Sequence, residues 1–328
     1  MKNIAIITGG DSEEYNISIK SAQTVKKHLN PKNFNSIIIY VEKGLFHAEI
    51  NNKLYPIKKD DFSLFKNGKT INFDAVFMAL HGPPAENGLI QCYFNSLKIP
   101  YTSCNESVSA ITFNKGRCQD RLMRLGFSCA DFLIYDCSKI EDIRKMRNIE
   151  TIYDKIGFPC FVKPTESGSS LGISKVKSEI DLNAAIQKAL KYNNEVIIER
   201  SIEGTEVSCG VFEDSEIIAL PLTEIITKNE FFDYQAKYHG ESQEITPANI
   251  DRDLTVLIQD TAKSIYKLMN LRGLCRIDFI IFKRTPFVIE INTIPGLSEE
   301  SIIPKQIKES KFCLTEIFEI CIKKSSNK

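Results

Sequence analysis

The sequence predicts a mixed α/β fold with more than one domain. The chain has 328 residues, and at roughly 100–200 residues per domain this length corresponds to two or three domains. Apolar strand patterns alternate with helical patterns over residues 2–102, which indicates a parallel sheet with helical crossovers. Beyond residue 103 the strand patterns come in pairs, as is typical of antiparallel hairpins. We therefore expect a parallel sheet in the N-terminal part and antiparallel strands after it.

The composition and the net charge of the chain argue against several classes of protein. Lys and Arg number 42 and Asp and Glu number 42, so the formal net charge is zero, which argues against a protein that binds nucleic acid through a basic surface. No apolar run approaches the roughly 18–20 residues of a membrane helix, and the N-terminus lacks the pattern of a signal peptide. The ten cysteines contain no CxxC pair. This favours reduced thiols in a cytoplasmic protein over a disulfide framework or a zinc site.

Two predicted strands in the N-terminal part of the chain are each followed by a loop that is a candidate ligand-binding site. The apolar run Lys2–Thr8 predicts a strand that ends at Gly9, and Phe73–Leu80 predicts another that ends at His81. Ligands bind at the carboxyl ends of parallel strands, so the loops Gly9–Asn16 and His81–Gly88 are candidate binding loops. The other elements predicted here are a helix around Ile19–Leu29, a strand Ser36–Val41, a helix Gly88–Leu97 and a short strand Ile99–Thr102.

The later part of the chain contains a predicted hairpin with a long tip. Its strands are Phe158–Lys163 and Ile173–Val176, and small residues fill the tip between them. Ser178 is expected to cap the helix that follows, which runs to Leu190. The remaining predicted elements are a helix Ser107–Leu125, strands Glu195–Glu199 and Glu206–Phe212, a loop Phe231–Gln243, a helix Leu254–Met269, and a hairpin of Arg276–Phe282 with Phe287–Asn292.

Two loops have the composition of anion-binding segments. In the Gly168–Gly172 loop, small residues leave backbone N–H groups open to an anion, and Lys163 supplies a positive charge at the loop base. The alternative is a flexible hairpin tip. Lys237 and Tyr238, in the irregular loop, could close over phosphates as a lid, or they could lie on an ordinary surface loop. The four histidines stand in no credible Ser–His–Asp arrangement, so we expect no covalent enzyme intermediate.

Asp278, Glu290 and Asn292 form a candidate metal site. Glu290 and Asn292 are two residues apart on one predicted strand and therefore share a face. Asp278 lies on the preceding strand of the same hairpin. Oxygen ligands without His or Cys suit Mg²⁺ or Mn²⁺, which also bind phosphate oxygens. The alternative is three solvated side chains on one sheet face.

In chain order, these motifs resemble the D-alanine–D-alanine ligases of the ATP-grasp superfamily, and the resemblance covers nearly the whole chain. The matching motifs are GG-S-E (Gly9–Glu14) with Ser18, ALHG (Ala79–Gly82) with Glu86 and Gly88, IPYT (Ile99–Thr102), FNK (Phe113–Lys115), KP-GSS-G (Lys163–Gly172), IER-G-E (Ile198–Glu206), DY-AKY (Asp233–Tyr238), RID (Arg276–Asp278), EIN-PG (Glu290–Gly296) and S-EES-IP (Ser298–Pro304).

The resemblance implies a fold and a reaction. The fold is an ATP-grasp fold of three α/β domains, 1–103, 104–194 and 195–328, with ATP gripped between two antiparallel sheets. In the reaction, the carboxylate of one D-alanine attacks the γ-phosphate of ATP to give D-alanyl phosphate. The amine of a second D-alanine then displaces phosphate, which yields the dipeptide for peptidoglycan synthesis. The implied partners are D-alanine and ATP with two Mg²⁺ or Mn²⁺ ions, and a homodimer is expected because family members are commonly homodimers.

The resemblance also implies roles for individual residues. Asp278, Glu290 and Asn292 are expected to bind the metal ions. Arg276 and the Gly296 N–H are expected to stabilise the acyl phosphate and the tetrahedral adduct. The first D-alanine is expected near Glu14, Asn16, Ser18 and His81, and the second near Ser169, Tyr238, Ser301 and Ile302. The residues expected to contact ATP are Lys115, Lys163, Gly168, Ser169, Ser170, Gly172, Glu199, Arg200, Ile202, Glu206 and Lys237.

One departure from the family pattern bears on the first substrate. Many relatives carry a carboxylate at the position of Asn16, where it pairs with the ammonium of the first D-alanine, and an amide holds an ammonium less strongly. Glu14 is a candidate substitute. Alternative products are therefore D-Ala–D-Ser, D-Ala–D-lactate or a dipeptide with another first residue, and Asn16 and Ser298–Ile302 are the discriminating positions. A non-catalytic nucleotide-binding protein is the remote alternative, because the metal ligands and lysines are intact.

Overall fold

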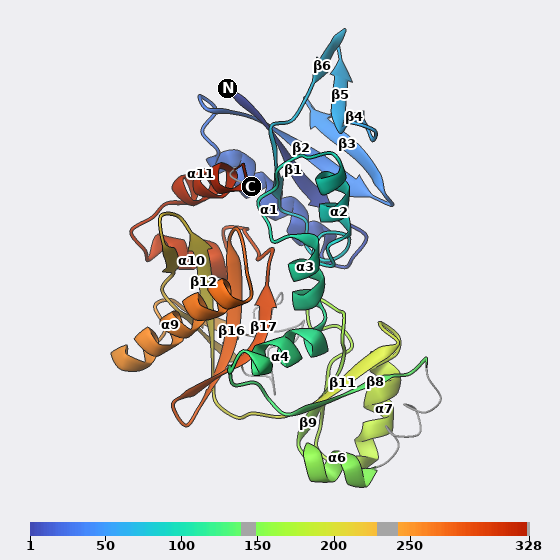
Figure 1. Cartoon of the computed structure of the whole chain (residues 1–328), viewed down its shortest axis with the longest axis vertical. Coiled ribbons are helices and arrows are strands. Elements are labelled where there is room, and N and C mark those ends of the chain that lie inside the picture. Colours follow the sequence, from blue (N-terminus) through green and yellow to red (C-terminus); the bar gives the residue numbers. More distant parts are fainter. Residues whose placement is uncertain (139–148, 228–241, 327–328) are drawn as a thin grey trace.

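The computed structural model describes residues 1–138, 149–227 and 242–326. Among these residues the strands form three sheets, with helices packed against each. Along the long axis of the molecule, the N-terminal sheet lies at one end and the sheet that contains β8, β9 and β11 lies at the other (Figure 1). The third sheet lies between them. The mixed α/β class is as predicted.

The N-terminal sheet is parallel only in its centre. Its strand order is β6-β5-β4-β3-β2-β1-β7, and β1 pairs in parallel with both β2 and β7. The strands from β2 to β6 are joined in antiparallel order, so the prediction of a parallel N-terminal sheet is wrong for this half. The bounds are β1 (Lys2–Gly9), β2 (Phe34–Glu42), β3 (Leu45–Ile50), β4 (Lys53–Lys58), β5 (Ser63–Lys66), β6 (Lys69–Ile71) and β7 (Ala75–Met78).

Two-residue turns with positive φ produce the antiparallel extension. Lys43 and Gly44 join β2 to β3 with φ of 47° and 71°, and Asn67 and Gly68 join β5 to β6 with φ of 50° and 74°. A turn with both central residues at positive φ matches the twist of the strands it connects, and Asn-Gly is its strongest sequence signal. The sequence therefore did carry a signal for one of these hairpins, at residues 67–68.

Helices cover both faces of the N-terminal sheet. Because side chains alternate along a strand, Ile4 and Ile6 enter one core with α1 and α11, while Ile7 enters the other with α2. The Phe77 ring meets the Phe318 ring at 5.3 Å in an edge-on contact. The C-terminal helix therefore belongs structurally to the N-terminal sheet. The bounds are α1 (Tyr15–His28), α2 (Leu89–Ser96), α10 (Ile302–Lys308) and α11 (Leu314–Ser325).

The second sheet has the order β10-β9-β11-β8, and all its pairs are antiparallel. The predicted hairpin is confirmed as β9 with β10. Since β11 pairs with β8 and β9, the predicted domain boundary at residue 194 is wrong and would detach β11 from its sheet. Ser178 precedes α7, but its side chain makes no capping hydrogen bond. The bounds are β8 (Phe132–Asp136), α6 (Ile149–Lys155), β9 (Cys160–Pro164), β10 (Ser174–Val176), α7 (Glu179–Ala189) and β11 (Glu195–Arg200).

The third sheet has the order β15-β14-β12-β16-β17, with β13 paired to β12. The predicted β16–β17 hairpin is confirmed, and its register sets Asp278 opposite Glu290 and Arg276 opposite Asn292. Helix α9 packs on this sheet together with α3 and α4. The bounds are β12 (Thr205–Glu213), β13 (Ile217–Ala219), β14 (Thr223–Thr227), β15 (Ser242–Ile245), α9 (Arg252–Leu268), β16 (Cys275–Phe282) and β17 (Thr285–Asn292).

The single helix predicted over Ser107–Leu125 is two helices, α3 (Glu106–Phe113) and α4 (Lys115–Arg124). Asn114 separates them because its ψ of 107° is extended. Its side chain accepts a hydrogen bond from the Arg117 N–H and so caps α4. Asn is among the preferred N-cap residues, and this cap places Lys115 at the first position of a helix.

Two expectations from composition can be compared with the structure. The ten cysteines carry free thiols, and seven of them are buried. Within the described residues, no helix combines the length and the apolar character required to cross a membrane.

Candidate active site

Two adjoining cavities lie where the three sheets meet. The larger has a volume of about 390 Å³ and the smaller about 120 Å³. Both are lined by Lys115, Ser170, Arg276 and Glu290, so these residues form the boundary between them. Polar and apolar surface contribute about equally to the larger cavity, which several charged side chains line, and the smaller cavity is mainly apolar. We call them the amino-acid cavity and the nucleotide cavity, after the ligands that the resemblance of the sequence implies.

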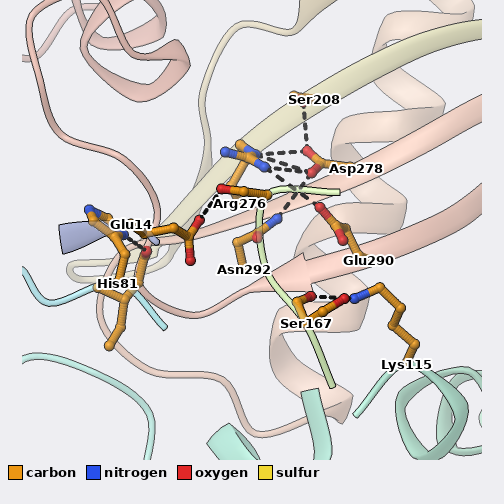
Figure 2. Close-up of polar contacts among 11 residues, drawn as sticks. Glu14, His81, Lys115, Ser167, Ser208, Arg276, Asp278, Glu290 and Asn292 are labelled. Atoms are coloured by element: carbon orange, nitrogen blue, oxygen red, sulfur yellow. Dashed lines mark hydrogen bonds and ion pairs between the residues drawn. The ribbon is translucent and has the colours of Figure 1, made fainter. Parts of the chain in front are cut away.

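The predicted metal ligands converge on the β16–β17 hairpin. Asn292 Nδ2 donates to Asp278 Oδ2 at 3.0 Å, and Arg276 contacts the same carboxylate at 2.8–3.2 Å. Arg276 also lies 3.9 Å from Glu290 Oε1. Figure 2 shows these side chains pointing toward one another across the two strands. The arrangement follows from the strand register, because neighbouring positions on adjacent strands share one face.

The donor set fits a hard divalent cation. Among the described residues no three His, Cys, Asp or Glu side chains gather as a complete metal cluster, and this site offers two carboxylates and one amide. Mg²⁺ commonly takes one or two carboxylates and completes its shell with phosphate and water oxygens. Because Asn292 turns its NH₂ group to Asp278, the amide oxygen remains a potential metal donor. Asp278 is held by the Ser208 hydroxyl at 2.6 Å.

The Gly168–Gly172 loop closes the amino-acid cavity on one side. Ser169 and Ser170 have φ of 49° and 59°, a left-handed conformation that is uncommon outside glycine and costs roughly 1–2 kcal/mol per residue. Ser169 Oγ donates to Glu14 Oε1 at 2.6 Å, which ties the loop to the N-terminal part of the chain. Lys115 Nζ donates to the Ser167 carbonyl at 2.7 Å. The loop thus brings together a lysine, two hydroxyls and a carboxylate.

Several acidic side chains line the amino-acid cavity. Glu14 and Glu86 both line it, together with Glu290 and the cation Arg276. Burial, together with the charges of Glu14 and Glu290, raises the pKa of Glu86 to about 8. Burial lowers the pKa of His81, so its ring is neutral at neutral pH. Glu86 is therefore mostly protonated at neutral pH, and Glu14 and Glu290 are the other acidic residues named here that an ammonium group could face.

The nucleotide cavity is an apolar slot with one ionic edge. Lys163 and Glu199 form an ion pair there, with only 10% and 8% of their side chains exposed. Gln119 Nε2 donates to the second oxygen of Glu199 at 2.9 Å. Glu206 lines the mouth of the slot. A mostly apolar cavity with a few fixed polar groups is typical of a site for a small molecule or cofactor. The apolar residues that line it include Ala130, Phe161, Ile202, Ile280, Phe287 and Val288.

The structure brings most of the expected site residues to these two cavities. Three are placed elsewhere. Asn16 is exposed on α1 and does not line either cavity. Ser18 is fully buried behind the wall, and Gly172 lies at the base of the loop against Pro164 and Tyr192. The residues that line a cavity as expected are Glu14, His81, Lys115, Lys163, Gly168, Ser169, Ser170, Glu199, Arg200, Ile202, Glu206, Arg276, Asp278, Glu290, Asn292, Gly296, Ser301 and Ile302.

The predicted lid and Arg200 differ from the other expected site residues. Lys237 and Tyr238, with the rest of the predicted lid, lie outside the described residues. Arg200 lines the nucleotide cavity, but its guanidinium group donates to the carbonyls of Ile156 and Lys155 at 3.1 Å and lies 3.2 Å from Asp131 Oδ2. Arg200 therefore supports the junction between α6 and β11.

Four residues with site contacts were not predicted. Ser208 could have been found because it follows Glu206 by two positions and so shares its strand face. Glu86 was noted only as part of a motif. Gln119 and Ser21 carry no pattern of their own, because their partners Glu199 and His81 lie 80 and 60 residues away in the chain.

Comparison with known proteins identifies the same architecture. The family model described as D-ala D-ala ligase N-terminus matches residues 3–104, and the model described as D-ala D-ala ligase C-terminus matches residues 122–323. The chain is 46% identical to the D-alanine--D-alanine ligase of Flavobacterium johnsoniae over 97% of each chain. It is 43% identical to the ligase of the same name from Christiangramia forsetii over 99% of each chain.

Solved structures give the same result. The VanG D-Ala:D-Ser ligase of Enterococcus faecalis superposes with a TM-score of 0.87 at 29% identity, over 99% of both chains. The D-alanyl-alanine synthetase A of Vibrio cholerae also has a TM-score of 0.87, at 26% identity, over 100% of this chain and 99% of its own. The two family models together match most of the chain, and the relatives match over nearly its full length. This chain belongs to the D-alanine–D-alanine ligase family.

Proposed function

We propose that this protein is an ADP-forming D-alanine–D-alanine ligase that supplies the dipeptide for peptidoglycan. The observation that carries the proposal is the convergence of Arg276, Asp278, Glu290 and Asn292 at the boundary between a polar cavity and an apolar slot. A γ-phosphate at this boundary would lie between a nucleotide in the slot and an amino acid in the polar cavity. The family membership supports the same activity.

In the first step, the residues of the chain align the D-alanine carboxylate with the γ-phosphate of ATP. We propose that Glu14 receives the ammonium, and that Lys115 and the loop around Ser169 hold phosphate oxygens; all of them line the same cavity. Phosphoryl transfer depends mainly on positioning and charge neutralisation, which fits a site without a nucleophilic side chain. When bound at Asp278, Glu290 and Asn292, two divalent ions would neutralise charge on the β- and γ-phosphates.

In the second step, the amine of another D-alanine attacks the D-alanyl phosphate. Arg276 lines the amino-acid cavity, and we propose that it supplies positive charge where the tetrahedral adduct becomes anionic. The Gly296 N–H is proposed as the second donor to that oxyanion. Ser301 and Ile302 line the same cavity and are proposed to contact the second amino acid.

The choice of second substrate is the alternative that the comparisons favour most. A D-Ala:D-Ser ligase and a D-alanyl-alanine synthetase superpose with the same TM-score, so the fold does not separate the two products. Ser298 and Ser301 share a hydrogen bond of 2.8 Å at the wall of the cavity. This hydroxyl pair is the local feature that would contact a D-serine side chain.

The test is ADP release by the purified protein with ATP, MgCl₂ and a panel of D-alanine, D-serine and D-lactate, with products identified by mass spectrometry. We expect ADP release that depends on D-alanine, with D-alanyl-D-alanine as the product. A mixed dipeptide would support the D-Ala:D-Ser alternative, and ATP binding without turnover would support a non-catalytic protein. The homodimer stays a prediction, which light scattering of the purified protein tests.

A further inference from the structure

A chain of buried hydrogen bonds joins α1 to the turn that follows β17. His81 Nδ1 lies 2.9 Å from the Ile294 carbonyl, and His81 Nε2 lies 2.9 Å from Ser21 Oγ. The Leu297 N–H donates to the same Ser21 oxygen at 3.1 Å. All four residues are buried, with 4% or less of their surface exposed. The chain therefore connects the N-terminal sheet unit to the segment directly after the metal-binding strand.

The direction of each hydrogen bond follows from the groups involved. A carbonyl oxygen only accepts, so His81 Nδ1 must carry the proton. In the neutral ring, Nε2 is then an acceptor, and the Ser21 hydroxyl donates to it. The Ser21 oxygen in turn accepts from the Leu297 N–H. Both ring nitrogens are thus fully used within the protein, and no ring nitrogen remains to bind a substrate.

The two ends of this chain enclose the proposed oxyanion donor. Ile294 and Leu297 are the anchored residues, and Pro295 and Gly296 lie between them. On the other side, the His81 N–H donates to Ser18 Oγ at 2.9 Å, and Ser18 Oγ donates to the Glu14 carbonyl at 3.2 Å. The backbone of Glu14 and the Gly296 turn are therefore fixed to the same histidine.

We propose that His81 and Ser21 are positioning residues that lock the Gly296 turn onto α1 and so set the separation between the groups that hold the two ends of the first amino acid. This inference rests on the proposed function and refines it. It also changes the expected role of His81, because the ring acts through Ile294 and Ser21 instead of contacting substrate. Ser21 has no role in the reaction without this connection.

The kinetic test is a double-mutant cycle with Ser21→Ala and His81→Asn. We expect each single variant to lower kcat/KM for D-alanine by roughly 10–100-fold, the range expected for small misplacements of reacting groups, with the KM for ATP unchanged. Because both act through one chain of bonds, His81→Asn should add little in the Ser21→Ala background. Equal costs of His81→Asn in both backgrounds would instead show direct contact with substrate and overturn the proposal.

Thr24→Val is the matched control. Thr24 lies one turn further along α1 and is also buried, and its hydroxyl donates to the Lys20 carbonyl within the same helix. We expect it to retain wild-type kinetics. If Thr24→Val and Ser21→Ala lower activity equally, the effect belongs to α1 stability and the proposal fails.

A second measurement does not depend on activity. The chain has four histidines, so ¹⁵N NMR of the imidazole groups of the wild-type protein at pH 7.5 is practicable. We expect His81 to be the neutral Nδ1–H tautomer, with a shift of its Nε2 resonance in Ser21→Ala. A protonated Nε2 in the wild-type protein would contradict the inference. Absence of D-alanine-dependent ADP release would count against the proposed function alone, since the tautomer is measured separately.

Discussion

The amino-acid cavity and the nucleotide cavity share a boundary but are built differently. The amino-acid cavity is assembled from segments far apart in the chain, such as Glu14, His81 and Gly296, and hydrogen bonds between those segments hold it. The nucleotide cavity lies between β9 and β17 and is held by apolar packing around one buried ion pair. From this difference we predict that selectivity for the amino acid depends on contacts between distant segments of the chain, and that nucleotide binding depends on local packing.

The largest expected effect is at the boundary between the two cavities. Glu290→Gln should lower turnover by roughly 10³-fold, as loss of a charge-stabilising group in a site typically does, because it removes a proposed metal ligand. The fold should persist, since Glu290 is 29% exposed and Arg276 keeps its contact with Asp278. ADP release and the thermal midpoint Tm measure the two effects. Glu213→Gln, at an exposed ion pair with Lys324, is the control, and full activity of Glu290→Gln would refute the metal assignment.

Gly168→Ala should damage the amino-acid cavity selectively. A Cβ at residue 168 would clash with Glu14 Oε2, so either the loop or the carboxylate must move. We expect a fall of about 10–100-fold in kcat/KM for D-alanine with a small change in the KM for ATP. Gly126→Ala is the comparison: its Cβ meets nothing within 4 Å, but φ is +88°, so it should cost stability and leave kinetics intact. Similar kinetics for the two variants would contradict the close contact with Glu14.

Glu199→Gln tests the nucleotide cavity. The change leaves the Lys163 ammonium buried without a counter-charge, and breaking a buried pair typically costs about 3–5 kcal/mol. We expect a clear fall in Tm and a several-fold higher KM for ATP, with the KM for D-alanine little changed. Scanning fluorimetry with and without ATP measures this. Glu299→Gln, in an exposed pair with Lys27, should leave Tm unchanged, and an equal shift in both variants would show that the Lys163 pair is not buried in solution.

The smallest effect concerns the pH dependence of stability. Because burial raises the pKa of Glu86 to about 8, the folded state binds a proton that the unfolded state releases near its ordinary pKa of 4.5. The stabilisation from Glu86 is therefore complete below pH 4.5 and is lost as the pH rises toward about 8. In metal-free protein, Glu86→Gln should gain Tm relative to wild type between pH 5 and 8. A constant difference across that range would show an ordinary carboxylate.

The sequence was most informative where chemistry depends on residues close in the chain. Glu290 and Asn292 share a face because they are two apart on one strand, and the register then brings Asp278 beside them. It was least informative where partners are distant. Ser18 is sequestered behind the cavity wall by the backbone of His81, and no local pattern indicates this. Asn16 lies on the exposed face of α1, so its departure from the family pattern does not reach the cavity wall.

The secondary-structure elements also divide into those that the local sequence predicts well and those that it does not. Buried strands such as β1 and β16 were predicted because continuous apolar runs mark them. The strands β3–β6 are short and half-exposed, so their hydrophobic pattern is weak and only the turn residues indicate them. The break at Asn114 was missed because helical periodicity continues on both sides of it, and only the cap geometry separates α3 from α4.

That break has a mechanical consequence. The Asn114 amide that starts α4 also donates to Glu166 and Glu195, both at 3.0 Å, and the Lys115 N–H donates to the Thr165 carbonyl at 2.9 Å. Lys115 is thereby fastened at its main chain to the second sheet and at its ammonium to Ser167. A rotation of that sheet would therefore move the Lys115 ammonium together with the Gly168–Gly172 loop, so that both would reach a bound phosphate in the same motion.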